Sequence, residues 1–319
     1  MFIGYLYIGF IYFYSYIIIF FKDDIKINRI KRGVVQMKKI LLVLLLLIIF
    51  VCTYLAYINN NRVILVSQYS DFYELDNYDN TKNTLKLLTY NIQHGVGTDG
   101  RLDLDRVAQV IEQSGADVIG LNEVDFALKR SGFKNQVRYL AKTLNMNYAF
   151  GASVRRVTGS YGNAILSKYP INNVENYILP AIDENNSETR SLLKAEIEIP
   201  NNKQESYHIM STHLSLNKKE RSEQIKWIDN FVSNHTGAYI LMGDFNTDVE
   251  EIIYTVKNIN DTPDKLTPLL NGLKTFPSLN PSKGIDLYFS SSQLEVIKAY
   301  SIESDASDHL PVYIELKLS

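Results

Sequence analysis

Cysteine is nearly absent from this sequence of 319 residues: Cys52 stands alone, which excludes a fold held together by disulfides. A basic excess is also missing, because 33 Lys and Arg stand against 35 Asp and Glu and leave a net charge of −2. A protein that binds nucleic acid through its overall charge is therefore disfavoured. The low hydrophobicity typical of a disordered chain is lacking as well, since 46% of the residues are hydrophobic.

The charge is unevenly distributed along the chain. Residues 1–84 carry a net charge of +3, and residues 85–319 carry a net charge of −5. An acidic domain is a poor partner for a polyanion. A net charge of only −5 is nevertheless compatible with a local basic patch on the domain.

Two apolar runs without any charged residue stand near the N-terminus, at residues 2–21 and 40–58. Each has about the 20 residues that a helix needs to cross a bilayer. The second run follows Met37-Lys38-Lys39 and has no small-residue cleavage motif after it, which predicts an uncleaved transmembrane signal anchor over 37–58. The loop between the runs holds seven Lys and Arg, so the positive-inside rule places it in the cytoplasm and the rest of the chain outside the cell.

The first 36 residues have two interpretations. They are either a first transmembrane span or a spurious extension upstream of the true start, because Met37 followed by two lysines and a leucine-rich run is itself a credible beginning. Residues 59–84 are polar and rich in Asn, and they predict a juxtamembrane stalk with at most one short strand at 63–66.

From residue 85 the pattern changes to strands alternating with amphipathic helices. We predict helices over 104–115, 134–145 and 218–232, the first capped by Asp103 and ended by Gly115. Apolar runs predict strands near 85–90, 117–121, 148, 164–167, 192–199, 207–212, 238–242, 285–289, 296–300 and 311–316. Few helices separate the last strands, so the fold class is α/β (α+β) with mixed sheets.

Polar residues gather where these apolar strands end. The residues concerned are Asn91, Glu123, His213, Asp244, Asn246, Asp286, Asp308 and His309. Carboxylates and amides at strand ends suit a hard cation such as Mg²⁺, and histidines can contact a phosphate oxygen. The pattern predicts a site for a metal ion and a phosphate.

Seven short strings carry a family resemblance. They are Thr89-Tyr-Asn91-Ile, Gly120-Leu-Asn-Glu123, Gly162-Asn-Ala-Ile-Leu-Ser167, Ser211-Thr-His213, Met242-Gly-Asp-Phe-Asn246, Gly284-Ile-Asp286 and Ser307-Asp-His309-Leu-Pro311. In this order they resemble the endonuclease/exonuclease/phosphatase superfamily, which includes deoxyribonucleases, abasic-site endonucleases, inositol polyphosphate phosphatases and neutral sphingomyelinases. The resemblance covers residues 85–319 and implies a four-layer sandwich, two packed mixed β-sheets with helices outside.

The resemblance also implies a metal site and a water-activating group. Glu123 resembles the principal Mg²⁺ ligand, with Asn91 in support and Asp308 as a further carboxylate of the metal site. Asp244 resembles the residue that activates or orients the attacking water, and Asn246 its orienting neighbour. Because Mn²⁺ prefers similar ligands, it should substitute for Mg²⁺.

The resemblance further implies which residues contact the phosphate. His309 resembles the histidine beside the scissile phosphate, with Asp286 holding its ring, and His213 resembles a second phosphate-facing histidine. Arg190 lies where the deoxyribonuclease-like branch often has an arginine, and the spacing suggests that Asn163 supports His213 in substrate binding. Arg155 and Arg156 are interpreted as a solvated loop, with phosphate contact as the weaker alternative.

These features predict a metal-dependent phosphoesterase that attacks a phosphate ester with water. The acidic domain and the membrane anchor favour a phospholipid or lipid-linked phosphate as substrate. An exported nuclease acting on DNA or RNA is the alternative, and a catalytically idle binding module is the third interpretation. The inositol phosphatase branch is disfavoured, because this chain has Ser282-Lys-Gly-Ile-Asp286-Leu where that branch has Pro-Ala-Trp-Cys-Asp-Arg.

Overall fold

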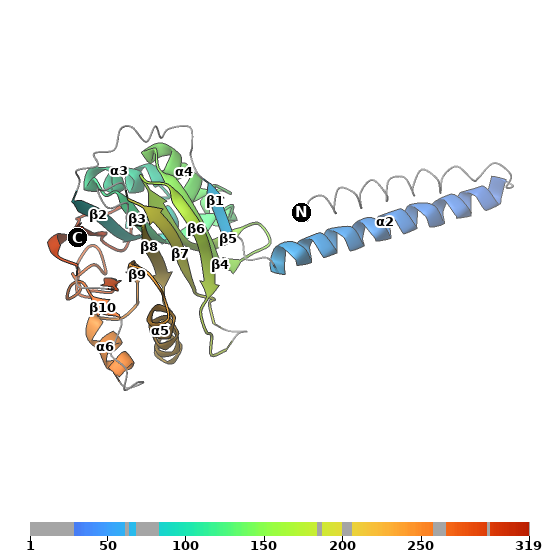
Figure 1. Cartoon of the computed structure of the whole chain (residues 1–319). Coiled ribbons are helices and arrows are strands. Elements are labelled where there is room, and N and C mark those ends of the chain that lie inside the picture. Colours follow the sequence, from blue (N-terminus) through green and yellow to red (C-terminus); the bar gives the residue numbers. More distant parts are fainter. Residues whose placement is uncertain are drawn as a thin grey trace. The chain divides into compact units, whose positions relative to one another are not determined.

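A computed structural model describes residues 29–60, 64–67, 83–183, 187–199, 206–257, 266–291 and 294–318. The chain divides into two compact units, Met1–Asn61 and Arg62–Ser319. In the first unit the described residues form one helix, α2 (Arg29–Asn60), seen in Figure 1. Across the described part of the chain, no helix has both the length and the apolar character needed to span a membrane. The run at 2–21 lies outside the described residues, and the anchor over 37–58 stays a prediction.

The second unit is built on two mixed β-sheets. The first sheet has seven strands in the order β1-β4-β5-β3-β2-β13-β12, and the second has six in the order β10-β11-β9-β8-β7-β6. Strands β2 and β3 pair in parallel, as do β8 and β9, whereas the other neighbouring strands pair antiparallel.

The strands of the first sheet are β1 (Ile64–Ser67), β2 (Thr84–Asn91), β3 (Val118–Phe126), β4 (Asn147–Arg155), β5 (Ser160–Ser167), β12 (Val296–Ser301) and β13 (Val312–Lys317). Those of the second are β6 (Ile171–Ile178), β7 (Ser191–Glu198), β8 (Ser206–His213), β9 (Tyr239–Asp244), β10 (Thr267–Pro268) and β11 (Asp286–Ser290).

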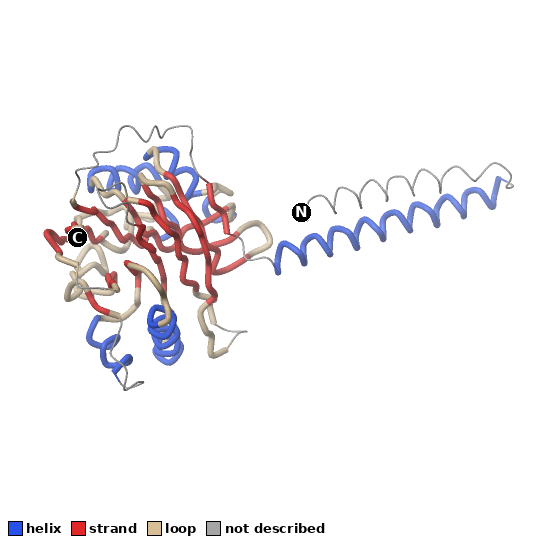
Figure 2. Tube along the Cα trace, viewed as in Figure 1, coloured by secondary structure: helices blue, strands red, loops and turns tan. Residues whose placement is uncertain are grey.

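Helices cover the outer face of each sheet. In Figure 1, α3 (Leu104–Ser114) and α4 (Gln136–Leu144) lie on one side of the strands, and α5 (Lys218–Ser233) and α6 (Val249–Lys257) lie on the other. The tube in Figure 2 shows the same separation of helices from strands. The predicted arrangement of two packed mixed sheets flanked by helices is confirmed.

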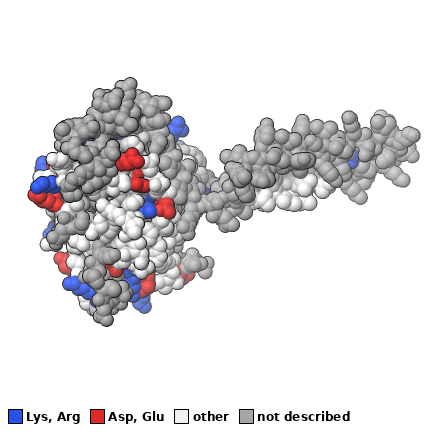
Figure 3. Space-filling model, viewed as in Figure 1, with Lys and Arg blue, Asp and Glu red and all other residues white. Residues whose placement is uncertain are grey.

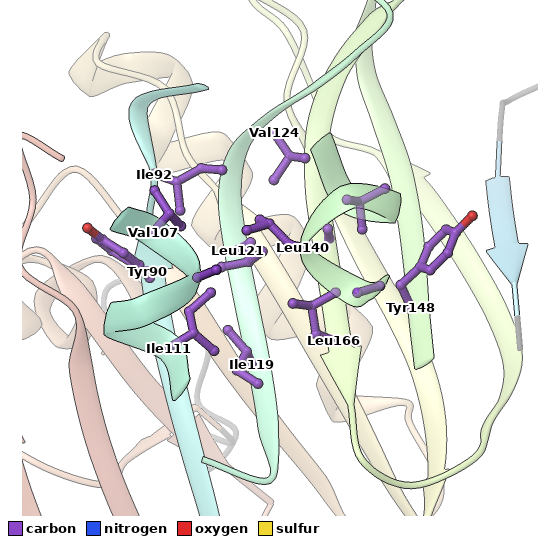
Figure 4. Packing of buried hydrophobic residues seen from close by; sticks show 14 of the residues in the cluster. Tyr90, Ile92, Val107, Ile111, Ile119, Leu121, Val124, Leu140, Tyr148 and Leu166 are labelled. Carbon is purple, nitrogen blue, oxygen red and sulfur yellow. The ribbon is translucent and has the colours of Figure 1, made fainter. Parts of the chain in front are cut away.

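Helix α3 illustrates how local sequence and packing agree. Asp103 caps its first turn by accepting hydrogen bonds from the backbone N–H groups of Asp105 and Arg106, and Gly115 ends it at φ 65°. Its apolar face, with Val107 and Ile111, packs on β3 beside Leu140 of α4 (Figure 4). An amphipathic sequence therefore becomes a covering layer because its apolar stripe has a sheet face to bury.

The face between the sheets forms a second core. The side chains that meet there include Leu87, Val118, Ile165 and Ile314 from the first sheet and Leu193, Ile209, Ile240 and Met242 from the second. All of these side chains are buried, so the two sheets are held together over their length by apolar contact.

The structure corrects several predicted elements. The strand expected to end at 121 continues to Phe126, so Glu123 lies within β3 and not at its end. Strand β6 and helix α6 were not predicted, because the alternating polar residues of an edge strand and a short helix give weak periodic signals. The short strand predicted at 63–66 is confirmed as β1 one residue later, and it pairs with β4.

Candidate active site

The ends of four strands meet at one edge of the sandwich. His213 ends β8, Asp244 ends β9 and Asp286 begins β11, and the register places His213 and Asp286 on either side of Asp244. In the other sheet, Asn91 ends β2 opposite Asn122 of β3. Parallel pairing of β2 with β3 and of β8 with β9, and antiparallel pairing of β9 with β11, thus bring together residues that are far apart in the sequence.

Strand β3 carries an irregularity at this edge. Asn122 and Glu123 lie between two paired positions of β3, where the neighbouring β5 has one residue, so the strand contains a β-bulge. Glu123 has φ 60°, a conformation that a glutamate rarely adopts. A strained residue at a bulge often marks a functional site, because the bulge redirects a side chain that the regular pleat would point elsewhere.

Asn122 joins the two sheets beneath the site. Its Oδ1 accepts a hydrogen bond from the backbone N–H of Asp244 at 3.0 Å, and its Nδ2 donates to the carbonyl of Thr212 at 2.9 Å. Nδ2 also donates to Oδ1 of Asn163 at 2.9 Å. The Asn122 side chain is completely buried, so it fixes where the last residues of β8 and β9 lie relative to the bulge.

The structure does not support Asn163 as a substrate-binding residue. Its side chain is buried, does not line the cavity, and donates from Nδ2 to the carbonyl of Ser191 at 2.9 Å. Asn163 therefore holds Asn122 and β7 in place inside the protein. It was predicted to support His213 in substrate binding.

The Asp244 carboxylate lies at the centre of the site. Its Oδ2 accepts a hydrogen bond from Nδ2 of Asn91 at 3.0 Å, and its Oδ1 accepts one from the backbone N–H of Asn246 at 2.9 Å. Burial raises the pKa of Asp244 to about 7, and the nearby negative charge of Asp286 adds to the effect. Such a carboxyl group can exchange a proton near neutral pH.

His309 and Asp286 form a buried pair. Nδ1 of His309 lies 2.9 Å from Oδ2 of Asp286, and the same oxygen accepts a hydrogen bond from the Thr275 hydroxyl at 2.5 Å. Burial by itself would lower the pKa of His309, but the charge of Asp286, its hydrogen bond to the ring and the charges of Asp244 and Asp308 together outweigh burial and raise the pKa to about 10. Nε2 of His309 lies 3.7 Å from Oδ2 of Asp244. The ring is thus held protonated with its second N–H beside Asp244.

His213 has the opposite character. Nη1 of Arg190 lies 3.0 Å from its Nδ1, and because a guanidinium can only donate, that nitrogen must accept. Burial, together with the Arg190 charge, lowers the pKa of His213 well below its usual value. The ring is therefore neutral, and its Nε2 lies 3.5 Å from Oδ2 of Asp244. The Asn246 amide nitrogen lies 3.0 Å from Nε2 and donates to the Leu214 carbonyl at 2.9 Å.

Two of the predicted metal ligands, Glu123 and Asp308, line the cavity, and the third, Asn91, lies buried beside Glu123. Nδ2 of Asn91 donates to Oε1 of Glu123 at 3.3 Å, and Nδ1 of His94 lies 4.0 Å from Oε2. Burial opposes ionisation of Glu123, but the neighbouring polar and basic side chains, His94 first among them, together outweigh burial and lower the pKa to about 2. Glu123 is therefore an anion at any physiological pH.

Asp308 completes this group. Burial raises the pKa of Asp308, and the negative charge of Glu123 raises it further. Two carboxylates that repel each other across a cavity fit a divalent cation, which would relieve the repulsion. Ligand atoms of Asp244, Asp286 and His309 also lie within 4.8 Å of one another. Asp286 does not line the cavity, however, and its Oδ2 already holds His309, so Glu123 and Asp308 fit the cation better.

A cavity of about 790 Å³ opens above these residues. Its walls combine cationic and apolar side chains. The cationic ones are Lys129, Arg130, Arg156, Arg190, Arg221 and Lys283, and the apolar ones include Leu128, Val154, Leu216, Phe276 and Ile285. Arg130 is tied to Asp125 by two hydrogen bonds of 2.7 and 2.8 Å, which fixes its position at the wall.

Sequence reasoning missed several residues that the structure places at the site. Asn122 belongs to the family motif Gly120-Leu-Asn-Glu123. Its buried hydrogen bonds between the two sheets have no sequence pattern of their own. Thr275 and Lys283 lie in loops without a motif, Lys129 and Arg130 lie in a short 3-10 turn, and Arg221 lies in the first turn of α5. Ser307, which donates from its hydroxyl to the Asn91 carbonyl at 2.7 Å, was adjacent to the predicted Asp308.

The fold and site define a class: a helix-covered double sheet with a carboxylate, amide and histidine site for phosphate ester hydrolysis. Residues 88–309 match the Endonuclease/Exonuclease/phosphatase family, and the chain belongs to this family. Its members are hydrolases of phosphate esters and typically depend on a divalent metal ion.

Relatives share the second unit of the chain. YbhP of Escherichia coli is 26% identical over 250 residues, which cover 74% of this chain and 97% of YbhP. A family structure from Beutenbergia cavernae has a TM-score of 0.59 at 22% identity, covering 75% of this chain and 72% of that one. Mannosyl-6-phosphatase Bt3783 of Bacteroides thetaiotaomicron has a TM-score of 0.55 at 20% identity, covering 73% of this chain and 99% of that one. Both structures share the fold.

Proposed function

We propose that this chain is a divalent-metal-dependent phosphoesterase that hydrolyses a phosphodiester or phosphomonoester at a membrane surface, with a lipid or lipid-linked phosphate as its substrate. One observation carries the proposal. The His309–Asp286 pair, the Asp244 carboxylate and the anionic Glu123 and Asp308 all converge on one edge of the sandwich, beside a single cavity.

The residues have complementary tasks in this proposal. Asp244, fixed by Asn91 and the Asn246 backbone, orients a water molecule and accepts its proton. His309, held by Asp286, donates a hydrogen bond or a proton to an oxygen of the phosphoryl group. The guanidinium of Arg190, which lies beside the neutral His213 ring, supplies a further donor for phosphate oxygens.

Mg²⁺, or Mn²⁺ in its place, would be held by Glu123 and Asp308 with Asn91 in support. When bound, it supplies positive charge that polarises the phosphate ester. The Glu123 side chain is the first candidate ligand because it remains ionised and faces the cavity.

The walls of the cavity support a phosphate ester with an apolar part. Leu128, Val154 and Leu216 line the cavity together with basic residues, so a phosphate and an adjoining hydrocarbon portion both find complementary surface. The sequence adds the predicted anchor, and large apolar side chains between Ile40 and Val51 of α2 are exposed to solvent. These observations favour a lipid-linked substrate.

A nuclease is the second candidate, because six cationic side chains line the cavity and suit a polyanionic strand. It ranks lower because residues 85–319 carry a net charge of −5, and a nucleic acid would contact more of the domain than the cavity alone.

The same proposal places the catalytic domain outside the cell, attached through the N-terminal apolar segment. Protease added to intact cells should then cleave the chain after residue 58. Protection of the whole domain until lysis would overturn this orientation. The intact mass of the native protein will decide whether residues 1–36 are part of it.

The activity is tested by incubating the purified protein with Mg²⁺, or with EDTA as control, and measuring hydrolysis of lipid phosphodiesters, lipid phosphomonoesters and plasmid DNA. We expect EDTA-sensitive hydrolysis of a lipid phosphate ester. Cleavage of DNA alone would replace the substrate proposal by the nuclease, and absence of any turnover would favour an idle binding module.

A further inference from the structure

Four loops border the cavity, and each carries an exposed large apolar side chain. The loops, counted with the last residue of β4 and the first two residues of α5, are 127–135, 155–159, 214–219 and 276–284, and each contributes residues to the cavity wall. Their exposed apolar residues are Phe133, Val157, Leu216 and Leu279, with 57%, 105%, 76% and 78% of their surface accessible. Large apolar side chains grouped around one opening indicate a surface that binds an apolar partner.

The same loops are strongly basic. They contain Lys129, Arg130, Lys134, Arg155, Arg156, Lys218, Lys219 and Lys283, and they contain no Asp or Glu. The domain as a whole carries −5, and the face of it seen in Figure 3 shows both signs of charge. Positive charge is therefore concentrated in these loops.

Part of this charge is available for an external partner. Arg130 is neutralised by Asp125, and Lys218 lies 3.4 Å from Glu251. Lys129, Arg156 and Lys283 are exposed, and within the described residues none of them forms an ion pair. Cations that alternate with exposed apolar side chains complement anionic headgroups above a hydrocarbon layer.

We infer that the four loops form a docking rim that inserts Phe133, Val157 and Leu279 into an anionic lipid bilayer and so places the cavity mouth against lipid phosphates. This inference rests on the proposed function, because docking would bring the active site to its lipid substrate. The experiment that tests docking does not require the protein to be active. A nucleic acid would match the basic residues yet offer nothing to fully exposed aliphatic side chains such as Val157.

The depth of the loops can be measured in the full chain. After Cys52→Ser, a single cysteine at Val157→Cys or Leu279→Cys is labelled with an environment-sensitive fluorophore. The control is Ile297→Cys on β12, which is half-exposed and does not line the cavity. The protein is reconstituted with vesicles of phosphatidylcholine alone or mixed equally with phosphatidylglycerol.

In the anionic vesicles we expect a blue shift at positions 157 and 279 and quenching by nitroxide-labelled lipid, with a much smaller response at 297. A water-like probe at 157, or an equal response at 297, would overturn the docking rim. Because this measurement needs no catalysis, it is decided separately from the proposed function.

Activity provides the second readout. A variant with Phe133→Ser, Val157→Ser and Leu279→Ser should hydrolyse a lipid phosphate ester in anionic vesicles at least roughly tenfold more slowly, because burial of each such side chain contributes to binding. Hydrolysis of a soluble aryl phosphodiester should be unchanged. Equal losses on both substrates would contradict docking. If neither the wild type nor the triple variant hydrolyses any ester, the proposed function fails, and the fluorescence measurement still decides whether the loops dock on the bilayer.

Discussion

Asn122 accepts a hydrogen bond from the backbone N–H of Asp244 at 3.0 Å, and this bond crosses from one sheet to the other. It connects the bulge that redirects Glu123 with the strand end that carries the central carboxylate. The Asn122 amide therefore holds the two halves of the site in position, together with the Asn91 amide, which donates to the Asp244 carboxylate from the same sheet.

Replacing Asn122 with Ala should lower the free energy of unfolding by about 2–3 kcal/mol, because the Asp244 N–H and the Thr212 carbonyl would lose a buried partner. Turnover should fall as well. Urea unfolding and an activity assay measure both effects, with the exposed Asn230→Ala as control, expected within about 0.5 kcal/mol of wild type. A wild-type stability for Asn122→Ala would show that the sheets do not depend on this contact.

Glu123→Gln keeps the size of the side chain and removes its charge. The affinity for Mg²⁺ or Mn²⁺ should decrease by more than the roughly 10–100-fold that loss of a supporting partner costs. Titration calorimetry checks this, with the exposed Glu112→Gln as the matched control. Unchanged metal binding in Glu123→Gln would remove Glu123 from the metal site.

His309→Ala should lower turnover by roughly 10²–10⁴-fold, since it deletes a positioned acid–base or electrostatic group, and should leave metal affinity nearly unchanged. Asp286→Asn should have a milder effect of the same kind, because the ring remains but is less firmly held. The double variant should resemble His309→Ala alone. Additive losses would mean that the two residues act independently.

Stability should depend on pH through His309. Its folded pKa of about 10 lies above the unfolded value of roughly 6.5, so its contribution is complete below pH 6.5 and is lost as the pH rises toward 10. In EDTA, the difference in unfolding free energy between wild type and His309→Gln should decline over this range, by at most about 1.4 kcal/mol per pH unit. A difference that is flat from pH 6 to 10 would exclude the charged pair.

Thr275→Val should loosen the His309–Asp286 pair without removing either member, since the Thr275 hydroxyl donates to the same Asp286 oxygen. We expect roughly a tenfold loss in turnover, partly restored by Thr275→Ser, which keeps the hydroxyl. Equal activity of the Val and Ser variants would show that the hydroxyl has no positioning role.

The strand-end residues were predictable because their signal is local. An apolar run followed by Asp244 or by His213 predicts a polar residue at a sheet edge, and the order of such strings indicates the family. The capped helix α3 was predictable for the same reason, since Asp103 and Gly115 act within one turn. Strand β6 was not, because an edge strand with alternating polar residues depends on its neighbour β7.

The sequence by itself determined which residue types end the strands and where the apolar stripes of the helices lie, because both depend on neighbours within a few positions. The tertiary structure decided the opposite protonation of His213 and His309, since one faces Arg190 and the other Asp286. The tertiary structure also places Asn163 in the interior, where the sequence had predicted substrate binding. It brings the four basic loops with exposed apolar side chains around one cavity. These properties depend on distances between segments far apart in the chain, which packing of the two sheets sets.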